Sequence, residues 1–318
     1  MSGSVLQYAA CPEGTWDVAA ARPHPALRPG VRLYRGVRFG TGQPRRRLEI
    51  PVPWVSLVVG FGSPLRLVGA PRQPGAAPSG VRLVSAVAGL QTGPVVGEHD
   101  GRVAAVEVLL APWTAYRLFG VPLHALADRH LPAAELLGAR ADRLAEALAE
   151  QHDWTSRFML VDRALTRWLA TGPVPEPRVA WAWRQLARSG GRLPVAELAA
   201  RTGWSVRQLE NRLKEQAGLT PKSIGRMFRL GRALRLLADG SSTAVAAAES
   251  GYCDQSHLHL DFRRMTGATP REFFAARAAG GSLPPSGPPV SDRGTGTVTS
   301  APAPEHAPAR PRGRRRLP

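Results

Sequence analysis

Two copies of one pattern occupy residues 194–274, and this duplication constrains the fold more than any other feature of the chain. The first copy spans residues 194–218 and the second spans residues 242–267. Each copy starts with an Ala-rich segment, reaches a Gly and then an aromatic residue, and ends at a second Gly that is closely followed by Thr-Pro. The Gly–aromatic pairs are Gly203-Trp204 and Gly251-Tyr252. The repetition predicts two similar helical units.

The spacing within each copy predicts a short helix, a turn and a longer helix. Gly203 and Gly251 suit a left-handed helix end, and Ser205 and Asp254 are N-cap candidates for the longer helix. Apolar residues then recur at helical spacing, while the opposite face is polar. These apolar stripes are Val206, Leu209 and Leu213 in the first copy and Leu258, Phe262 and Met265 in the second. This is the helix-turn-helix plan, in which the second helix enters the major groove of DNA.

The two copies closely resemble the paired helix-turn-helix motifs of AraC/XylS-type transcription regulators. The carrying segments are GWSVRQLENRLKEQAGLTPK and GYCDQSHLHLDFRRMTGATPREFF, with a joining run of Phe228, Leu230, Gly231, Arg232, Ala233 and Leu234. The resemblance covers roughly residues 181–274. It implies an all-α domain, at residues 180–279, that binds double-stranded DNA sequence-specifically. The spacing between the copies predicts one long helix over residues 222–237, capped by Thr220 with Pro221 in its first position.

The outward faces of the longer helices and the start of the joining helix supply the candidate DNA-binding residues. They are Ser205, Arg207, Gln208, Asn211, Arg212, Lys222, Gln255, Ser256, His257, Leu260, Arg263 and Arg264. We expect base-edge contacts from Arg207, Asn211, Gln255, Ser256 and His257, the last by resemblance, and phosphate contacts from the other cations. The alternative for the Arg residues is a solvated helix face.

Two of these positions depart from the family pattern. The family usually has Arg at the position of Asn211, and often at that of Leu260. Asn can bond adenine N6 and N7, and Leu can contact a thymine methyl group. We therefore expect this chain to recognise a different DNA site from that of its relatives.

The formal net charge of +18 favours a polyanionic partner. Residues 180–280 hold sixteen Arg and Lys against eight Asp and Glu, an excess of eight positive charges. A composition biased towards Arg, Ala, Gly and Pro explains the overall charge equally well. Residues 280–318 are rich in Pro and Arg, contain almost no large apolar residues, and are expected to be a disordered tail. Its terminal Arg cluster is either a phosphate-binding element or a solvated chain end.

The first 172 residues predict an α+β domain, because short β-branched runs are followed by helical spacing. Strands are expected over residues 31–39, 54–61, 81–87 and 103–110, with the second starting late or lying at a sheet edge because of Pro51 and Pro53. Helices are expected over residues 118–126, 133–151 and 158–169. Residues 54–62, 88–90 and 116–122 resemble the N-terminal sensing or dimerisation domain of one subgroup of the same regulators. Residues 173–179 are the expected linker. Trp181, Trp183 and Leu186 are expected to pack against the DNA-binding domain, and the alternative for the Trp rings is stacking on single-stranded nucleic acid.

Catalytic and metal-binding patterns are weak. The sequence has no Gly-x-Ser-x-Gly elbow, phosphate-binding loop or zinc-type His/Cys cluster. His257 and His259 lie two apart on a predicted helix and therefore diverge. The two Cys residues, Cys11 and Cys253, form no disulfide framework, which fits a reducing cytoplasm. We expect a soluble, cytoplasmic, bacterial non-enzyme without cofactor, associated with the nucleoid when bound to DNA.

The leading hypothesis is therefore a DNA-binding transcription regulator, either an activator or a repressor. Its expected partners are double-stranded DNA, RNA polymerase if it activates, and no membrane. A small-molecule effector and a homodimer both stay open, as do the operator and the direction of regulation. Two alternatives remain: a non-specific nucleoid-coating protein, and an N-terminal enzyme domain that the helix-turn-helix pair localises to DNA. The enzyme alternative would need a nucleophilic Cys in a dedicated motif, and the sequence around Cys11 contains no such motif.

Overall fold

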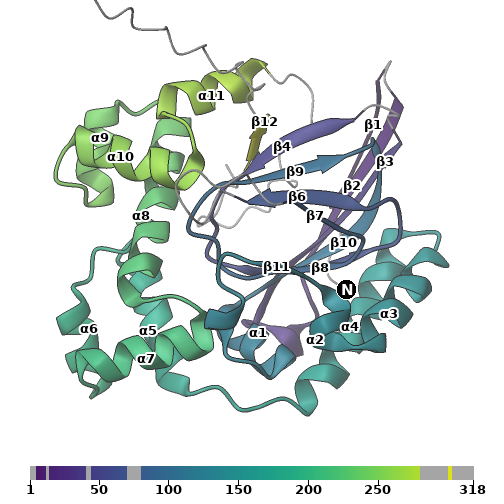
Figure 1. The fold of residues 1–318 in the computed structure, drawn as a ribbon, viewed down its shortest axis with the longest axis horizontal. Coiled ribbons are helices and arrows are strands. Elements are labelled where there is room, and N and C mark those ends of the chain that lie inside the picture. Colours follow the sequence, from purple (N-terminus) through teal and green to yellow (C-terminus); the bar gives the residue numbers. More distant parts are fainter. Residues whose placement is uncertain (1–4, 12–13, 41–43, 70–79, 280–299, 303–318) are drawn as a thin grey trace, which may run out of the picture.

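The computed structural model describes residues 5–11, 14–40, 44–69, 80–279 and 300–302 (Figure 1). The N-terminal part contains two antiparallel sheets. The first, in spatial order, is β1 (Val5–Cys11), β2 (Gly14–Ala21), β3 (Val31–Gly40), β10 (Arg102–Leu110), β5 (Val55–Gly60), β8 (Ala86–Ala88) and β11 (His130–Pro132). The second is β12 (Ser300–Pro302), β4 (Arg45–Glu49), β9 (Val95–His99), β6 (Leu65–Gly69) and β7 (Gly80–Leu83).

Alternating apolar residues build the centre of the first sheet. In β5, Val55, Leu57 and Val59 are buried, and in β10, Val106 and Val108 are buried. The register places Val106 opposite Val59 and Val108 opposite Leu57, so buried side chains from neighbouring strands pack on one face. Both sheets contribute to the same hydrophobic core, because Leu48 and Ile50, in and just after β4, join it.

Helices cover the first sheet and lead into the C-terminal part. They are α1 (Pro112–Phe119), the 3-10 turn η2 (Leu123–Ala125), α2 (Ala133–Leu137), α3 (Ala139–Ala149) and α4 (Trp154–Ala170). Tyr34 of β3 stacks on Phe158 of α4 with ring centroids 5.8 Å apart. The buried Arg157 of α4 donates to the carbonyl oxygens of Leu148 and Gln151, which ties α4 to the end of α3. The two helices therefore form a fixed hairpin on the sheet.

The predicted α+β class is confirmed, with corrections at the element level. Three predicted strands correspond to β3, β5 and β10. The fourth, over residues 81–87, is wrong as one strand, because it divides into β7 and β8. β5 starts late, at Val55, but lies between β10 and β8 and not at an edge.

The predicted helices of this region also need correction. The expected helix over residues 118–126 is the end of α1 followed by η2. The helix over residues 133–151 is broken at Gly138, whose φ of 57° and ψ of −155° end α2 before α3 begins. The predicted helix over residues 158–169 lies inside α4, which begins four residues earlier, at Trp154. Asp153 is its N-cap.

Over residues 177–279, the structure describes the helices α5 (Pro177–Arg188), α6 (Val195–Thr202), α7 (Val206–Ala217), α8 (Pro221–Ala238), α9 (Thr243–Ser250), α10 (Gln255–Thr266) and α11 (Pro270–Ala279). In Figure 1, α8 connects a group of helices that contains α5, α6 and α7 with a second group that contains α9, α10 and α11. α5 starts at Pro177, inside the predicted linker, because Pro suits the first helical position. The connection without regular structure is residues 171–176.

The two parts of the chain are packed against each other. The ring of Trp183 in α5 meets the rings of Trp113 in α1 and Phe228 in α8 edge-on, with centroids 6.2 and 5.4 Å away. The backbone N–H of Glu176 donates to Oε1 of Gln216 at 2.8 Å. Trp183 therefore packs against the DNA-binding domain as predicted, through Phe228, and its ring also contacts the N-terminal part through Trp113.

The C-terminal caps of α7 and α10 both lie beside the N-terminal part. Gly218 ends α7 with a φ of 91°, and a methyl group placed on it would lie 3.0 Å from the carbonyl oxygen of Leu123 in η2. Gly267 ends α10 with a φ of 75°, and a methyl group there would lie 3.4 Å from Cγ of Pro94, just before β9. The N-terminal part therefore touches the ends of two separate helices.

The structure describes one short segment of the expected tail. Ser300–Pro302 form β12 and pair antiparallel with β4. β4 would otherwise be the edge of its sheet, and an edge strand presents unpaired backbone groups to which another segment can add. Residues 280–299 and 303–318, with the terminal Arg cluster, lie outside the described residues. Among the described helices, none combines the length and the apolar character that a membrane crossing requires.

Candidate nucleic-acid interface

The first helix-turn-helix unit consists of α6 and α7, joined at Gly203 and Trp204. Gly203 ends α6 in the left-handed region, as predicted, with a φ of 69°. Ser205 caps α7 by accepting from the N–H of Gln208 at 3.2 Å, and Oε1 of Gln208 accepts from the N–H of Ser205 at 2.9 Å. This reciprocal capping box fixes where α7 begins. Two of the candidate DNA-binding residues therefore also hold the helix start.

The two faces of α7 separate as the sequence predicts, with one exception. Leu209 and Leu213 are fully buried, whereas Arg207, Gln208, Asn211 and Arg212 are exposed. Val206 belongs to the predicted apolar stripe, but 42% of its surface is exposed. It stands in the first helical position, and the buried face of α7 continues through its other end, at Gln216 and Ala217.

The second unit repeats this arrangement in α9 and α10. Gly251 ends α9 with a φ of 79°, and Asp254 caps α10 by accepting from the N–H of His257 at 2.7 Å. The predicted stripe of Leu258, Phe262 and Met265 is buried. The exposed residues of α10 include Gln255, Ser256, His259, Leu260, Arg263 and Arg264. Leu260 is 51% exposed, an apolar side chain available on a polar face.

His257 lies at the margin of that face. Its ring is half-buried and meets Tyr252 edge-on, with centroids 5.2 Å apart. The aromatic residue after Gly251 therefore orients the candidate DNA-contacting histidine. In the first unit, the equivalent Trp204 lies under the guanidinium group of Arg178, 4.4 Å from its ring centroid.

An ion pair that the sequence pattern does not reveal positions α10. The side chain of Asp261 is only 6% exposed and lies on the buried side of α10. Its two oxygens accept from Nε and Nη2 of Arg226 in α8 at 3.2 and 2.8 Å. A planar guanidinium group bound through two nitrogens restricts orientation as well as distance. The available signal was an acidic residue beside Phe262 in an otherwise apolar stripe.

The helix α8 joins the two units as predicted. Thr220 caps it by accepting from the N–H of Ser223, and Pro221 occupies its first turn. Ile224, Met227, Leu230 and Leu234 are buried along its length, while Lys222 is exposed at its start. Because α8 is one uninterrupted helix, it fixes the separation of the two units.

The exposed faces of α7, α8 and α10 carry mostly positive charge. The exposed cations are Arg207, Arg212, Lys214, Lys222, Arg263 and Arg264. Arg212 pairs with Glu215 at 3.0 Å, so its charge is partly compensated. Across the ranges that the structure describes, no group of three His, Cys, Asp or Glu side chains could hold a metal ion. The chemistry available on these faces is hydrogen bonding and cation contact with an anionic surface.

Two exposed helices, each held by a shorter helix across a tight turn, place this part of the protein in the helix-turn-helix class. Residues 178–276 match a family described as a helix-turn-helix domain, and residues 19–132 match a domain of unknown function (DUF6597). Over residues 178–276, the C-terminal part of the chain is similar to the helix-turn-helix domains of AraC/XylS-type regulators.

Known relatives match this chain over limited lengths. The HTH-type transcriptional activator RhaS of Escherichia fergusonii is 38% identical over 84 residues, which are 26% of this chain and 30% of the relative. The HTH-type transcriptional regulator RipA of Corynebacterium glutamicum is 33% identical over 124 residues, 38% of each chain. The chain thus spans about a third of the length of these relatives.

A solved AraC-type regulator from Chromobacterium violaceum is 29% identical to this chain. The likeness covers 33% of this chain and 96% of that one, with a TM-score of 0.31.

Proposed function

We propose that this protein is a sequence-specific transcription regulator, in which α7 and α10 enter successive major grooves on one face of double-stranded DNA. The observation that carries the proposal is the pair of capped, exposed polar helices at the two ends of α8. One turn of B-DNA separates successive major grooves by about 34 Å, which is the spacing that the two helices would have to match.

Within this proposal, the candidate residues divide by role. Arg207, Asn211, Gln255, Ser256 and His257 contact base edges, and Leu260 contacts a thymine methyl group. Arg212, Lys222, Arg263 and Arg264 contact phosphates and supply much of the affinity. Ser205 and Gln208 act at the first turn of α7, where they also form the capping box.

The N-terminal part would control this DNA binding, through an effector or through a homodimer. Its support is the contact that it makes with the ends of both α7 and α10. A ligand that binds one arrangement of the two parts more tightly shifts the population towards it. The relative RhaS is named an activator, and activation by this chain would add RNA polymerase as a partner in the cytoplasm.

The test is selection of random duplex DNA by the full chain, followed by affinity measurements across a salt series. The expected result is an enriched motif with two parts about one helical turn apart, each good base contact discriminating by roughly 1–3 kcal/mol. Steep salt dependence with no enriched motif would replace the proposal with non-specific coating of DNA. A DNA-modifying activity of the N-terminal part would require a chemically altered DNA product after incubation.

A further inference from the structure

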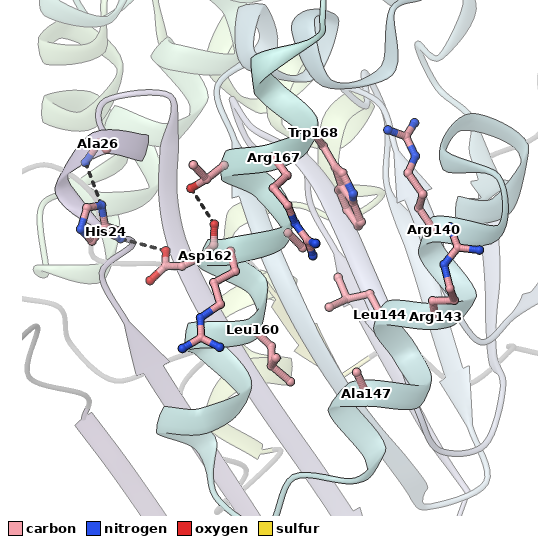
Figure 2. A pocket seen from close by; sticks show the side chains of 13 residues that line it. His24, Ala26, Arg140, Arg143, Leu144, Ala147, Leu160, Asp162, Arg167 and Trp168 are labelled. Atoms are coloured by element: carbon pink, nitrogen blue, oxygen red, sulfur yellow. Dashed lines mark hydrogen bonds between the residues drawn. The ribbon is translucent and has the colours of Figure 1, made fainter.

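The N-terminal part contains a groove that the DNA-binding faces do not use. It lies between α3, α4 and the turn formed by η1 (Pro25–Leu27), and has a volume of about 1070 Å³ (Figure 2). Small-molecule pockets typically have volumes of about 300–1,000 Å³. The floor is apolar and comes from both helices: Leu144, Ala147, Leu160, Ala164 and Trp168.

Four guanidinium groups border this floor. Arg140 and Arg143 come from α3, and Arg163 and Arg167 come from α4. Arg140 lies over the Trp168 ring, 5.6 Å from its centroid, and donates from Nε to the carbonyl oxygen of Leu137 at 3.0 Å. Within the described part of the chain, none of the four forms a salt bridge with a carboxylate, and the acidic residues of α3 are not among those that line the groove.

The one carboxylate lining the groove is already engaged. Asp162 accepts from the hydroxyl group of Tyr34 at 2.7 Å and from the backbone N–H of His24 at 2.9 Å. Burial and the bond to Asp162 raise the pKa of Tyr34, so its hydroxyl group stays a donor at neutral pH. Asp162 therefore holds the turn at residues 24–26 against α4 as a third wall, visible beside α4 in Figure 2.

We propose that this groove binds a compact organic anion, with an apolar body on the floor and an acidic group between the guanidinium groups. Charge complementarity favours an anion, because guanidinium groups without a carboxylate partner surround an apolar surface. Guanidinium groups bind carboxylate, sulfonate or phosphate oxygens through paired N–H donors. The three walls enclose a compact ligand better than an extended peptide helix. This site is separate from the DNA-binding faces, so it stands or falls independently of the proposed function.

Two dyes that differ in charge test the proposal on the full-length protein. Anilinonaphthalene sulfonate carries an acidic group on an apolar body, and N-phenylnaphthylamine is its neutral analogue. In the wild type, we expect the sulfonate dye to bind more tightly than the neutral dye. In the double variant Arg163→Gln/Arg167→Gln, we expect affinity for the sulfonate dye to fall about tenfold while affinity for the neutral dye is kept.

The matched control is Arg184→Gln/Arg188→Gln, two exposed arginines with the same spacing on α5. It removes the same charge elsewhere and should leave both affinities unchanged. Equal losses in the two double variants would show only the general attraction of a +18 chain, and would overturn the proposal. Displacement of the dyes by an acidic amphipathic peptide, without preference for the sulfonate, would make the groove a protein-docking surface and would also overturn it.

A filling variant provides a second readout. Ala147→Phe places a ring over the floor from a half-buried position on α3. We expect it to weaken both dyes, whereas the arginine variant weakens only the charged dye. Unchanged binding of both dyes by Ala147→Phe would place the dye elsewhere and contradict the proposal. DNA selection with the same variants separates this result from the proposed function, because neither should change the enriched motif.

Discussion

Asp261 brings a carboxylate into the buried side of α10, where Arg226 compensates it through two hydrogen bonds. Removing one partner of such a pair leaves an uncompensated charge. Since 30% of the Arg226 side chain is exposed, we expect Asp261→Ala to lower the free energy of unfolding by about 2–3 kcal/mol. The measurement is urea denaturation of the full chain.

The control for this pair removes both charges together. The double variant Arg226→Met/Asp261→Leu replaces the pair with apolar side chains of similar size, which is often neutral for buried pairs. We expect its stability to lie within about 1 kcal/mol of wild type. A double variant as unstable as Asp261→Ala would mean that the pair does not act as a unit.

His130, at the start of β11, makes stability depend on pH. Burial lowers the pKa of His130 from 6.5 to about 4, against the opposing charge of Asp128. The unfolded chain therefore takes up a proton as pH falls below 6.5, whereas the folded chain does so only near pH 4. The contribution of His130 to the free energy of unfolding is complete above pH 6.5 and is lost as the pH falls from 6.5 to 4. At pH 5 the loss amounts to about 2 kcal/mol.

The test compares denaturation at pH 7 and pH 5. We expect His130→Gln to lose about 2 kcal/mol less than wild type between these two conditions, because it lacks the titrating group. The matched control is His152→Gln, which removes a histidine from an exposed position. The same pH dependence in His130→Gln and wild type would exclude His130 as the source.

At the scale of elements, the exposed faces of α7 and α10 predict two different kinds of mutational effect. Asn211→Arg changes a proposed base contact and should change the preferred base at one position, by roughly 1–3 kcal/mol of discrimination. Arg263→Gln removes a proposed phosphate contact and should weaken binding to all sequences alike, reducing the salt slope by about 1. Selection and salt titration of both variants make the comparison. Identical effects would argue against the division of roles.

The helices that form the candidate interface could be predicted because their signals are local. Ser205, Asp254 and Thr220 cap their helices in the structure as expected, and the stripes of α7 and α10 are buried except for Val206. Cap geometry and helical spacing depend on residues within one or two turns. Whether the exposed residues contact DNA stays a prediction.

Several strands could not be predicted because distant pairing creates them. β2 has an Ala-rich sequence and β4 contains three consecutive Arg residues, so neither carries a β-branched alternating pattern. β2 exists through its pairing with β3, in a register that puts Val18 opposite Val37. Strand propensity largely reflects such neighbours. The same reason explains the missed Arg226–Asp261 pair, whose partners lie 35 residues apart.

At the scale of the whole molecule, the contact between the N-terminal part and α7 can be tested at two glycines. Gly203 and Gly218 both end helices of the first unit with positive φ, so Ala costs roughly 1–2 kcal/mol at either position. A methyl group at Gly203 meets open space, whereas one at Gly218 approaches the Leu123 carbonyl at 3.0 Å. We therefore expect Gly218→Ala to destabilise more than Gly203→Ala, and to speed protease cleavage at residues 171–176. Equal losses of stability in the two variants would mean that the contact between Gly218 and Leu123 does not contribute to stability.

Because Gly218 and Gly267 both lie against the N-terminal part, the two helix-turn-helix units are held at three points: by α8 and at both helix ends. A protein built in this way has little freedom to adjust the phase between its two proposed DNA contacts. Once one helix is bound, the other is presented at a fixed distance and therefore at a high effective concentration. Inserting about five base pairs between the half-sites turns the second one to the far side of the duplex. The protein would then hold such DNA with one helix only, and its affinity would fall to that of a single half-site.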